Sequence, residues 1–296
     1  MMVPVGLVAG GATMSESAEA AFNAFEAAAW EEKPTTYDSF FAPITSRLVG
    51  PILDAAAVGS GTRVLDVATG PGYAAAAAAG RGASAVGVDV AAAMVSLARR
   101  RYPGLDFRQA DAESLPFPAD SFDAVTANLA LMHLGRPEQA VAEFARVLAP
   151  GGRLALTAWD FPDRARLVGV FIDAVAAVNA ALPPSVPAGP SFFRFSPDGE
   201  CSRLLGSAGL TRVAVRTLQF EHSVSSGDDF WDGMLAATVR TSAVIVGQPE
   251  DVQKRIRAAF DQLVAPYARE RRLAIPVSIK LAAAKKPELA AAQPHL

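Results

Sequence analysis

The sequence predicts an α/β fold: a doubly wound, mostly parallel seven-stranded sheet with N-terminal helices and an inserted helical lid. Three observations predict it. Residues 64–72 read VLDVATGPG, an apolar strand that ends in an acid, passes a glycine turn and enters the alanine run 74–79. Residues 86–89 read VGVD, a second strand with an acid at its end. Strands and helices then alternate up to residue 158, which implies parallel strands joined by right-handed crossovers.

The N-terminal part is expected to be helical. A helix from Ser15 to Glu32 has its apolar positions on one face, at Ala18, Phe22, Phe25 and Ala29. Pro34 ends it, and a second helical stretch over 37–57 is interrupted by Pro43 and Pro51.

The alternating part supplies strands at 63–67, 85–89, 106–110, 122–128 and 152–158, with helices around 73–80, 91–101 and 136–148. After Trp159 strands and helices no longer alternate regularly. Helices are expected at 164–182, 198–208, 228–246 and 249–268, two last strands at 211–220 and 274–284, and a proline-rich loop at 183–190.

This order suggests a single domain over 15–285. It is made of an N-terminal helical cap (15–62), a core (63–160), and lid elements with the last two strands (161–285), where 160–200 and 222–270 cover the mouth of the pocket. Residues 1–14 are expected to form a disordered extension, in which Met14 is an alternative start to Met1, and 286–296 a frayed tail.

Composition excludes several classes of protein. With 51% hydrophobic and 19% charged residues, the chain of 296 residues can bury a substantial core. A net charge of −3 gives no reason to expect nucleic acid as a partner. The single cysteine, Cys201, rules out an internal disulfide and fits a cytoplasmic protein, and no apolar run is long enough to span a membrane.

The glycine turn predicts a nucleotide pocket. Gly70 and Gly72, followed by Ala75 and with Asp89 further on, match the dinucleotide fingerprint, so the glycines do not separate a nicotinamide cofactor from another adenosine ligand. Asp66 helps to choose between them. A carboxylate at that strand end would repel the negative charge of a pyrophosphate, whereas it would attract the positively charged ammonium and sulfonium of S-adenosylmethionine.

Two further segments agree with this reading. Residues 107–117 read FRQADAESLPF and residues 122–134 read FDAVTANLALMHL. With EFARVLAPGGRL at 143–154, they resemble the class I S-adenosylmethionine-dependent methyltransferases, most closely the quinone, sterol and natural-product subgroup, which has a Rossmann-like fold. The resemblance is strong over 63–160 and extends to 15–62 and 161–285 only in element order.

The resemblance implies S-adenosylmethionine as cofactor and assigns its contacts. The residues that match the family pattern around the methionine moiety and the ribose are Asp66, Gly70, Gly72 and Asp89. Those around the adenine are Val90, Met94, Asp111 and Ala112. Those facing the sulfonium and the methyl path are Asn128 and Leu129, with Tyr37 folded over the cofactor. Ala68 departs from the pattern, because the first glycine of the family's run usually stands there.

Three of these side chains also have a purely structural interpretation. Asp66 could cap the next helix, Asp111 could form a turn before Pro116, and Asn128 could be a buried amide that hydrogen-bonds backbone.

Two histidines are candidates for the catalytic base. A hydroxyl or carbon acid acceptor needs a base near neutral pKa, which histidine supplies most readily. His133 follows the fourth-strand motif and His222 follows strand 211–220, whereas His295 lies in the tail. Either of the first two could equally be structural. No metal-binding motif is present in the sequence.

The predicted function is therefore methyl transfer to a small, apolar or aromatic metabolite, at O, N or C. Aromatic residues gather in the segments expected to line the acceptor site: Phe40, Phe41, Trp159, Phe161, Phe192, Phe193, Phe195, Phe230 and Trp231. Simple lid packing explains them as well. The alternatives are an NAD(P)-dependent oxidoreductase that uses Gly70, Gly72 and Asp89, and a non-catalytic module that binds an adenosyl ligand. A homodimer is compatible with the sequence.

Overall fold

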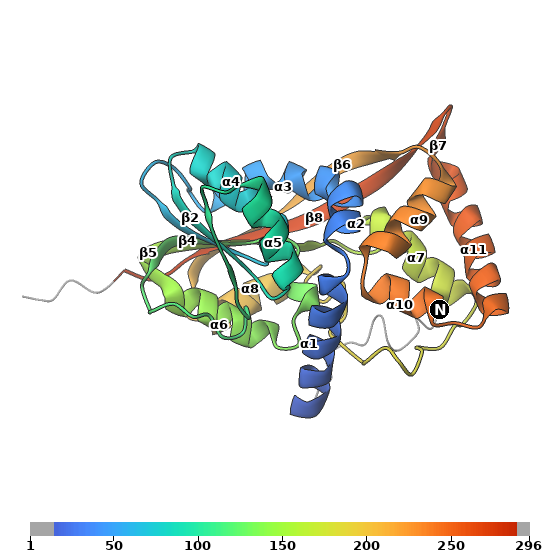
Figure 1. Ribbon diagram of the computed structural model, residues 1–296, viewed down its shortest axis with the longest axis horizontal. Coiled ribbons are helices and arrows are strands. Elements are labelled where there is room, and N and C mark those ends of the chain that lie inside the picture. Colours follow the sequence, from blue (N-terminus) through green and yellow to red (C-terminus); the bar gives the residue numbers. More distant parts are fainter. Residues whose placement is uncertain (1–14, 289–296) are drawn as a thin grey trace, which may run out of the picture.

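The computed structural model describes residues 15–288 (Figure 1). The expected extension 1–14, the alternative start Met14, the tail residues 289–296 and His295 lie outside the described residues.

A single sheet organises the chain, with strand order β3-β2-β1-β4-β5-β8-β6. β1 to β5 pair in parallel, and β8 is antiparallel to both β5 and β6. The strands are β1 (Arg63–Val67), β2 (Ser84–Asp89), β3 (Asp106–Gln109), β4 (Phe122–Ala127), β5 (Leu148–Trp159), β6 (Thr211–Val224), β7 (Ala268–Arg269) and β8 (Arg272–Lys285). The doubly wound α/β class is thus confirmed.

Helices cover both faces of the sheet. They are α1 (Glu16–Glu31), α2 (Pro34–Phe40), α3 (Ala42–Ala55), α4 (Tyr73–Gly80), α5 (Ala92–Arg101), α6 (Pro137–Val147), α7 (Arg166–Ala177), α8 (Asp198–Ser207), α9 (Gly227–Ala237), α10 (Arg240–Val246) and α11 (Glu250–Val264). α3, α4 and α5 share one buried cluster with β1, and α6 and α8 share another on the opposite face (Figure 1).

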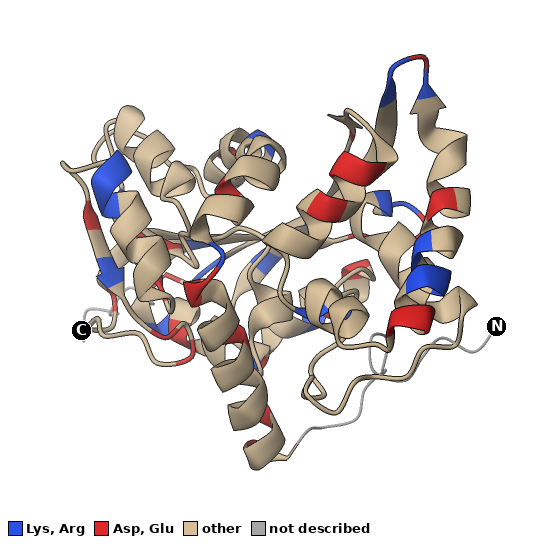
Figure 2. Cartoon of the chain, turned by 45° about the vertical axis from the view of Figure 1, so that its right-hand side comes forward, with Lys and Arg blue, Asp and Glu red and all other residues tan. Residues whose placement is uncertain are grey.

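The remaining helices α7, α9, α10 and α11 lie beyond one end of the sheet, where they form a third buried cluster with β8 (Figure 1). The long strands β6 and β8 run from the sheet into this cluster, and α1 lies between the two parts (Figure 1). Charged residues are scattered over both parts, and the turn between β7 and β8 carries Arg269, Glu270, Arg271 and Arg272 (Figure 2).

The sheet has eight strands where the sequence predicted seven. The helix expected over 249–268 ends at Val264, and a short 3-10 turn, Ala265–Tyr267, leads into β7, which pairs with β8. Pro266 lies within that turn, because its missing N–H cannot continue the helical hydrogen bonds.

Two predicted helices are divided in the structure. The stretch 37–57 separates into α2 and α3 at Phe41, and Pro34 begins α2 at its first position, where a missing N–H costs nothing. The stretch 228–246 separates at Thr238, which adopts extended backbone and accepts a hydrogen bond from the Ser242 N–H through its hydroxyl, 3.2 Å away.

Several boundaries also differ from the prediction. α7 ends at Ala177 rather than at 182, and β5 begins at Leu148 rather than at 152. β6 continues to Val224, because β8 supplies a partner along its whole length, so His222 lies within a strand and not after one. Within residues 15–288 no helix has the length and apolar composition needed to cross a bilayer.

Candidate active site

A cavity of about 900 Å³, the main cavity, opens at the carboxyl ends of the parallel strands, where ligands bind in sheets of this type. It gathers most of the side chains singled out in the sequence: Tyr37, Ala68, Gly70, Asp89, Val90, Met94, Asp111, Ala112, Asn128, Leu129 and His133. Asp66, Gly72 and His222 are not among its lining residues.

The glycine turn is joined to the end of β2. The Gly70 N–H donates to Oδ2 of Asp89 at 2.8 Å, and the Ala91 N–H donates to its Oδ1 at 3.0 Å. Burial raises the pKa of Asp89, and both backbone hydrogen bonds oppose that rise. An ionised carboxylate accepts about four hydrogen bonds, so Asp89 retains acceptor capacity toward the cavity that it lines.

Asp66 lies deeper than the sequence predicted. It lines a small cavity of about 350 Å³ beside the main one, together with Tyr37 and Gly70. Its carboxylate accepts from the hydroxyls of Thr69 at 2.6 Å and Thr126 at 2.8 Å. Burial raises its pKa to about 6, although these hydroxyls and the Ala75 backbone lower it.

Gly72 supports the turn by packing, not by lining a cavity. Its φ is +88°, and a Cβ built on it lies 2.8 Å from Cζ of the buried Phe107 ring. Ala68 has a φ of +54°, a region that costs an L-residue roughly 1–2 kcal/mol. Ala68 therefore carries a methyl group on left-handed backbone that glycine adopts without strain, and it lines the main and small cavities.

The opposite wall of the main cavity is more apolar. Val90 is 40% exposed, which is unusual for a large apolar side chain, and Met94 and Ala112 lie on the same cavity. Asp111 is exposed, and its Oδ1 accepts from the Glu113 N–H at 2.8 Å. Asp111 thus makes the turn that the structural interpretation required and also lines the cavity.

Asn128 and Leu129 follow β4 at the inner wall. The Asn128 amide donates to the Thr45 carbonyl at 3.2 Å and accepts from the Thr157 hydroxyl at 2.7 Å, so its polar atoms are engaged within the protein. Leu129 has a φ of +52°, and its N–H donates to the same hydroxyl at 2.8 Å. Strained non-glycine backbone of this kind gathers at functional sites.

Tyr37 lies where all three cavities meet. Its neighbour Asp38 is held by the Arg101 guanidinium at 2.6 Å and by the Tyr73 hydroxyl at 2.6 Å, which ties α2 to α5 and α4. Burial raises the pKa of the Tyr37 phenol to about 12, so it is neutral at physiological pH.

A second cavity of about 450 Å³ adjoins the main one, and Trp30, Tyr37, Leu129 and His133 line both. Its other lining residues come from α3, β5 and the helices beyond the sheet: Phe41, Thr45, Trp159, Val168, Phe192, Ala237, Thr238, Val239 and Thr241.

Only part of the predicted aromatic set lines this second cavity. Phe41, Trp159 and Phe192 do so. Phe230 and Trp231 instead pack against Phe171 and Phe260 in the third buried cluster, so the packing interpretation holds for them. Of the rest, Phe40 stacks on Phe230, Phe193 and Phe195 are buried, and Phe161 is 37% exposed.

The two candidate histidines occupy different places. His133 ends the 3-10 turn Leu131–His133 after β4 and lines the main and second cavities. His222 lies on the edge strand β6 and lines none of the three cavities described. Burial, with the nearby Arg47 cation, lowers the pKa of His222.

Sequence reasoning missed the contribution of α1 and of Glu113. Asn23, Glu26, Ala27 and Trp30 all line the main cavity, as does Glu113. The sequence does contain a feature that points to α1, because Glu26 interrupts the apolar stripe of this helix. Phe22, Glu26 and Trp30 are spaced four residues apart and so share one face, and Phe22 and Glu26 are both buried.

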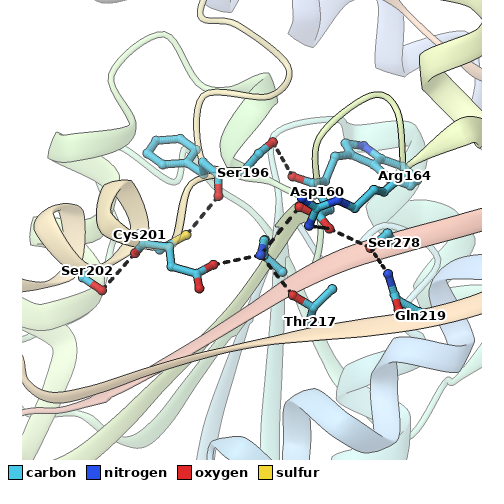
Figure 3. Close-up of polar contacts among 12 residues, drawn as sticks. Asp160, Arg164, Ser196, Cys201, Ser202, Thr217, Gln219 and Ser278 are labelled. Carbon is cyan, nitrogen blue, oxygen red and sulfur yellow. Dashed lines mark hydrogen bonds and ion pairs between the residues drawn. The ribbon is translucent and has the colours of Figure 1, made fainter.

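Another buried polar cluster surrounds Asp160 (Figure 3). Asp160 at the end of β5 accepts from the Ser278 hydroxyl at 2.8 Å and faces Lys280 at 3.6 Å. Burial opposes its ionisation, but these two partners and the nearby Arg164 hold its pKa below the usual value. No three His, Cys, Asp or Glu side chains within residues 15–288 gather as a metal site would require.

Comparison with known proteins shows the family. Residues 65–156 match the model described as a methyltransferase domain. Demethylmenaquinone methyltransferase of Renibacterium salmoninarum is 37% identical over 111 residues, which are 38% of this chain and 47% of that protein. The enzyme of the same name from Paenarthrobacter aurescens is 31% identical over 175 residues, which are 56% of this chain and 69% of that protein.

The chain belongs to the class I S-adenosylmethionine-dependent methyltransferases. The matched stretch spans 47% and 49% of the first two curated relatives. The crystal structure of YcgJ from Bacillus subtilis shows the same fold, with a TM-score of 0.55 and 23% identity over 82% of this chain and 99% of that one. None of these relatives supports the nicotinamide-dependent alternative.

The residues present fit S-adenosylmethionine. The main cavity combines a buried carboxylate with free acceptor capacity, the exposed apolar surface of Val90, and the carboxylates of Asp89 and Asp111. A diol, a planar base and a cation are complementary to these three features.

Proposed function

We propose that this chain transfers a methyl group from S-adenosylmethionine to a small, apolar or aromatic metabolite. One observation carries the proposal: an acid-lined cavity on the glycine turn adjoins an apolar cavity, and the two share Tyr37, Leu129 and His133. When bound, S-adenosylmethionine supplies a methyl group on a positively charged sulfur.

Within the main cavity, Asp89 is proposed to accept hydrogen bonds from the ribose hydroxyls. Val90 and Met94 are proposed to cover the adenine ring. Asp111 and Ala112 are proposed to lie at the amino edge of the adenine. Ala68, Gly70 and Asn128 provide the walls around the methionine moiety. We propose a supporting role for Asp66 and Gly72, since Asp66 is hydrogen-bonded to two threonines and Gly72 packs on Phe107.

The second cavity is the proposed acceptor site. Its walls are mostly aromatic and aliphatic, as ligand pockets tend to be. The names of the two demethylmenaquinone methyltransferases support an aromatic acceptor of the quinone class. Holding such an acceptor in line with the methyl group, and excluding water, is the main catalytic requirement.

The cysteine content and net charge of the chain support a cytoplasmic enzyme that acts on small molecules. A single cysteine and a net charge of −3 are typical of neither a secreted disulfide protein nor a nucleic-acid-binding one.

Calorimetry tests the cofactor. We expect S-adenosylhomocysteine to bind and NADH not to bind; the reverse result would favour the oxidoreductase. Transfer of a labelled methyl group is then measured on a panel of naphthols, hydroquinones and aromatic amines. Tight binding of S-adenosylhomocysteine without transfer to any member would favour a non-catalytic module.

A further inference from the structure

A buried ionic cluster borders the main cavity, and its members Trp30 and His133 also line the second cavity. Glu26 of α1 is 2% exposed, and its Oε2 accepts from the indole N–H of Trp30 at 3.1 Å. The same oxygen lies 3.0 Å from Nδ1 of His133. On the other side, the Arg240 guanidinium lies 3.3 Å from Oε1 of Glu26.

Arg240 is a fixed counter-ion for this carboxylate. It donates to the carbonyls of Pro190 and Met132, both at 2.6 Å, and its guanidinium lies 3.9 Å from the centre of the Phe192 ring. Burial lowers the pKa of Arg240 to about 10, which leaves it charged at neutral pH. Arg240 therefore places a positive charge directly beside the buried Glu26 carboxylate.

The contact with Glu26 sets the tautomer of His133. A carboxylate only accepts hydrogen bonds, so the proton of the neutral ring belongs on Nδ1, and Nε2 keeps its lone pair. Within residues 15–288, no protein group hydrogen-bonds Nε2. Trp30 and Phe192 hold the ring edge-on, with centroids at 5.2 and 6.0 Å.

We propose that Glu26 is a positioning residue that holds His133 as a base, and that the acceptor is an aromatic compound with an acidic hydroxyl, a phenol or hydroquinone, rather than an amine. This inference rests on the proposed function. It gives a task in the reaction to a carboxylate that lines the main cavity and contacts a histidine lining both cavities.

The proton and electron balance is simple. The hydroxyl proton moves to Nε2 of His133, and the imidazolium that forms is stabilised by Glu26. The oxygen electron pair forms the new O–C bond as the C–S bond breaks and leaves its pair on sulfur. Where the ring carbon beside the oxygen takes the methyl group instead, the hydrogen of that carbon moves to the oxygen. His133 finally gives its proton to water.

The first test reads the tautomer without any turnover. The full chain is labelled with ¹⁵N-histidine, saturated with S-adenosylhomocysteine, and studied by NMR at about pH 8, where imidazoles are ordinarily neutral. His133→Gln assigns the signal. We expect the wild-type ring to carry its proton on Nδ1 and Glu26→Gln to populate both tautomers, because an amide can donate as well as accept.

Asp160→Asn is the matched control. It also neutralises a buried carboxylate beside a cation, but it lines none of the three cavities and does not contact His133 (Figure 3). The tautomer should be unchanged in this variant. A wild-type proton on Nε2, or an identical tautomer in Glu26→Gln, would overturn the proposal.

The second test separates positioning from general structure by acceptor acidity. On 1-naphthol we expect Glu26→Gln to lower kcat by about 10- to 1000-fold while KM changes by less than about threefold. On a nitrophenol, which is already ionised, the loss should fall to within about threefold, because no proton has to be removed. Equal losses on both acceptors would show a merely structural role and refute the proposal.

Binding of S-adenosylhomocysteine distinguishes failure of the proposed function from failure of the proposed role of Glu26. If the wild type fails to bind S-adenosylhomocysteine, the proposed function itself is wrong. If it binds and methylates only amines, with Glu26→Gln as active as the wild type, the proposed function stands and the role of Glu26 does not.

Discussion

The two glycines of the turn should fail in different ways when each is replaced by alanine. In Gly72→Ala the new methyl group meets Cζ of Phe107 at 2.8 Å and Cβ of Ala98 at 3.2 Å, on backbone with a φ of +88°. Left-handed strain costs about 1–2 kcal/mol and overpacking a full core about 1–3 kcal/mol. A less flexible unfolded chain returns about 0.4–1 kcal/mol. We therefore expect a loss of about 2–4 kcal/mol in the free energy of unfolding.

Gly70→Ala is the matched control. Its φ is +51°, and the nearest atom to an added Cβ is Cε1 of Tyr37 at 3.9 Å, so there is strain without a clash. The expected loss of stability is about 1 kcal/mol. Because Gly70 lines the main cavity and Gly72 does not, only Gly70→Ala should weaken S-adenosylhomocysteine directly.

Urea unfolding, followed by circular dichroism and tryptophan fluorescence, measures both variants. Phe107→Leu should recover part of the Gly72→Ala loss, because a smaller side chain leaves room for the methyl group. If Gly72→Ala costs less than about 0.5 kcal/mol, or no more than Gly70→Ala, the packing argument is refuted.

Three further predictions follow from the site. Asp89→Asn should weaken S-adenosylhomocysteine by about 1–3 kcal/mol in calorimetry, since the amide offers one accepting oxygen where the carboxylate offers two to Gly70, Ala91 and the ribose; unchanged affinity would remove Asp89 from the ribose site. Because burial raises the folded-state pKa of Asp66 from 3.8 to about 6, its stabilising contribution is complete below the unfolded pKa and disappears as pH rises through about 6. Asp66→Asn should therefore gain about 2–3 kcal/mol relative to the wild type between about pH 4 and pH 7, and parallel stability curves would contradict this. Ala237→Trp, which fills the second cavity, should lower kcat/KM for the acceptor about tenfold or more while S-adenosylhomocysteine affinity stays within about twofold; an equal loss of both would mean that the cavities are not separate sites.

Much of the cofactor half of the site was predictable because its residues stand at strand ends. In a parallel sheet the carboxyl ends of neighbouring strands meet at one edge, so Asp89, Asp111 and Asn128 had to lie near the glycine turn. The contacts of each residue were not predictable. The Asp66 carboxylate accepts hydrogen bonds from Thr69 and Thr126, and Gly72 packs against the Phe107 ring. These contacts depend on how α4 and α5 pack on the sheet.

The proposed acceptor half of the site depended on contacts between segments far apart in the chain. Glu26 and Arg240 are separated by more than two hundred residues, and nothing local to either one indicates that they meet beside His133. The same reason explains the two histidines. His133 was expected beside the cavity because it follows a core strand, whereas the position of His222 depended on how far β6 pairs with β8.

The sequence by itself thus determined the sheet class, the glycine turn and the acids at the ends of the parallel strands, because hydrophobic period, turn chemistry and strand-end position are local properties. Only the tertiary structure decided that Glu26 holds His133, that three of the predicted aromatics line the second cavity, and that others serve packing alone. Those outcomes depend on which surfaces of α1, α9 and α10 come together, and burial of apolar area across the whole chain selects that arrangement.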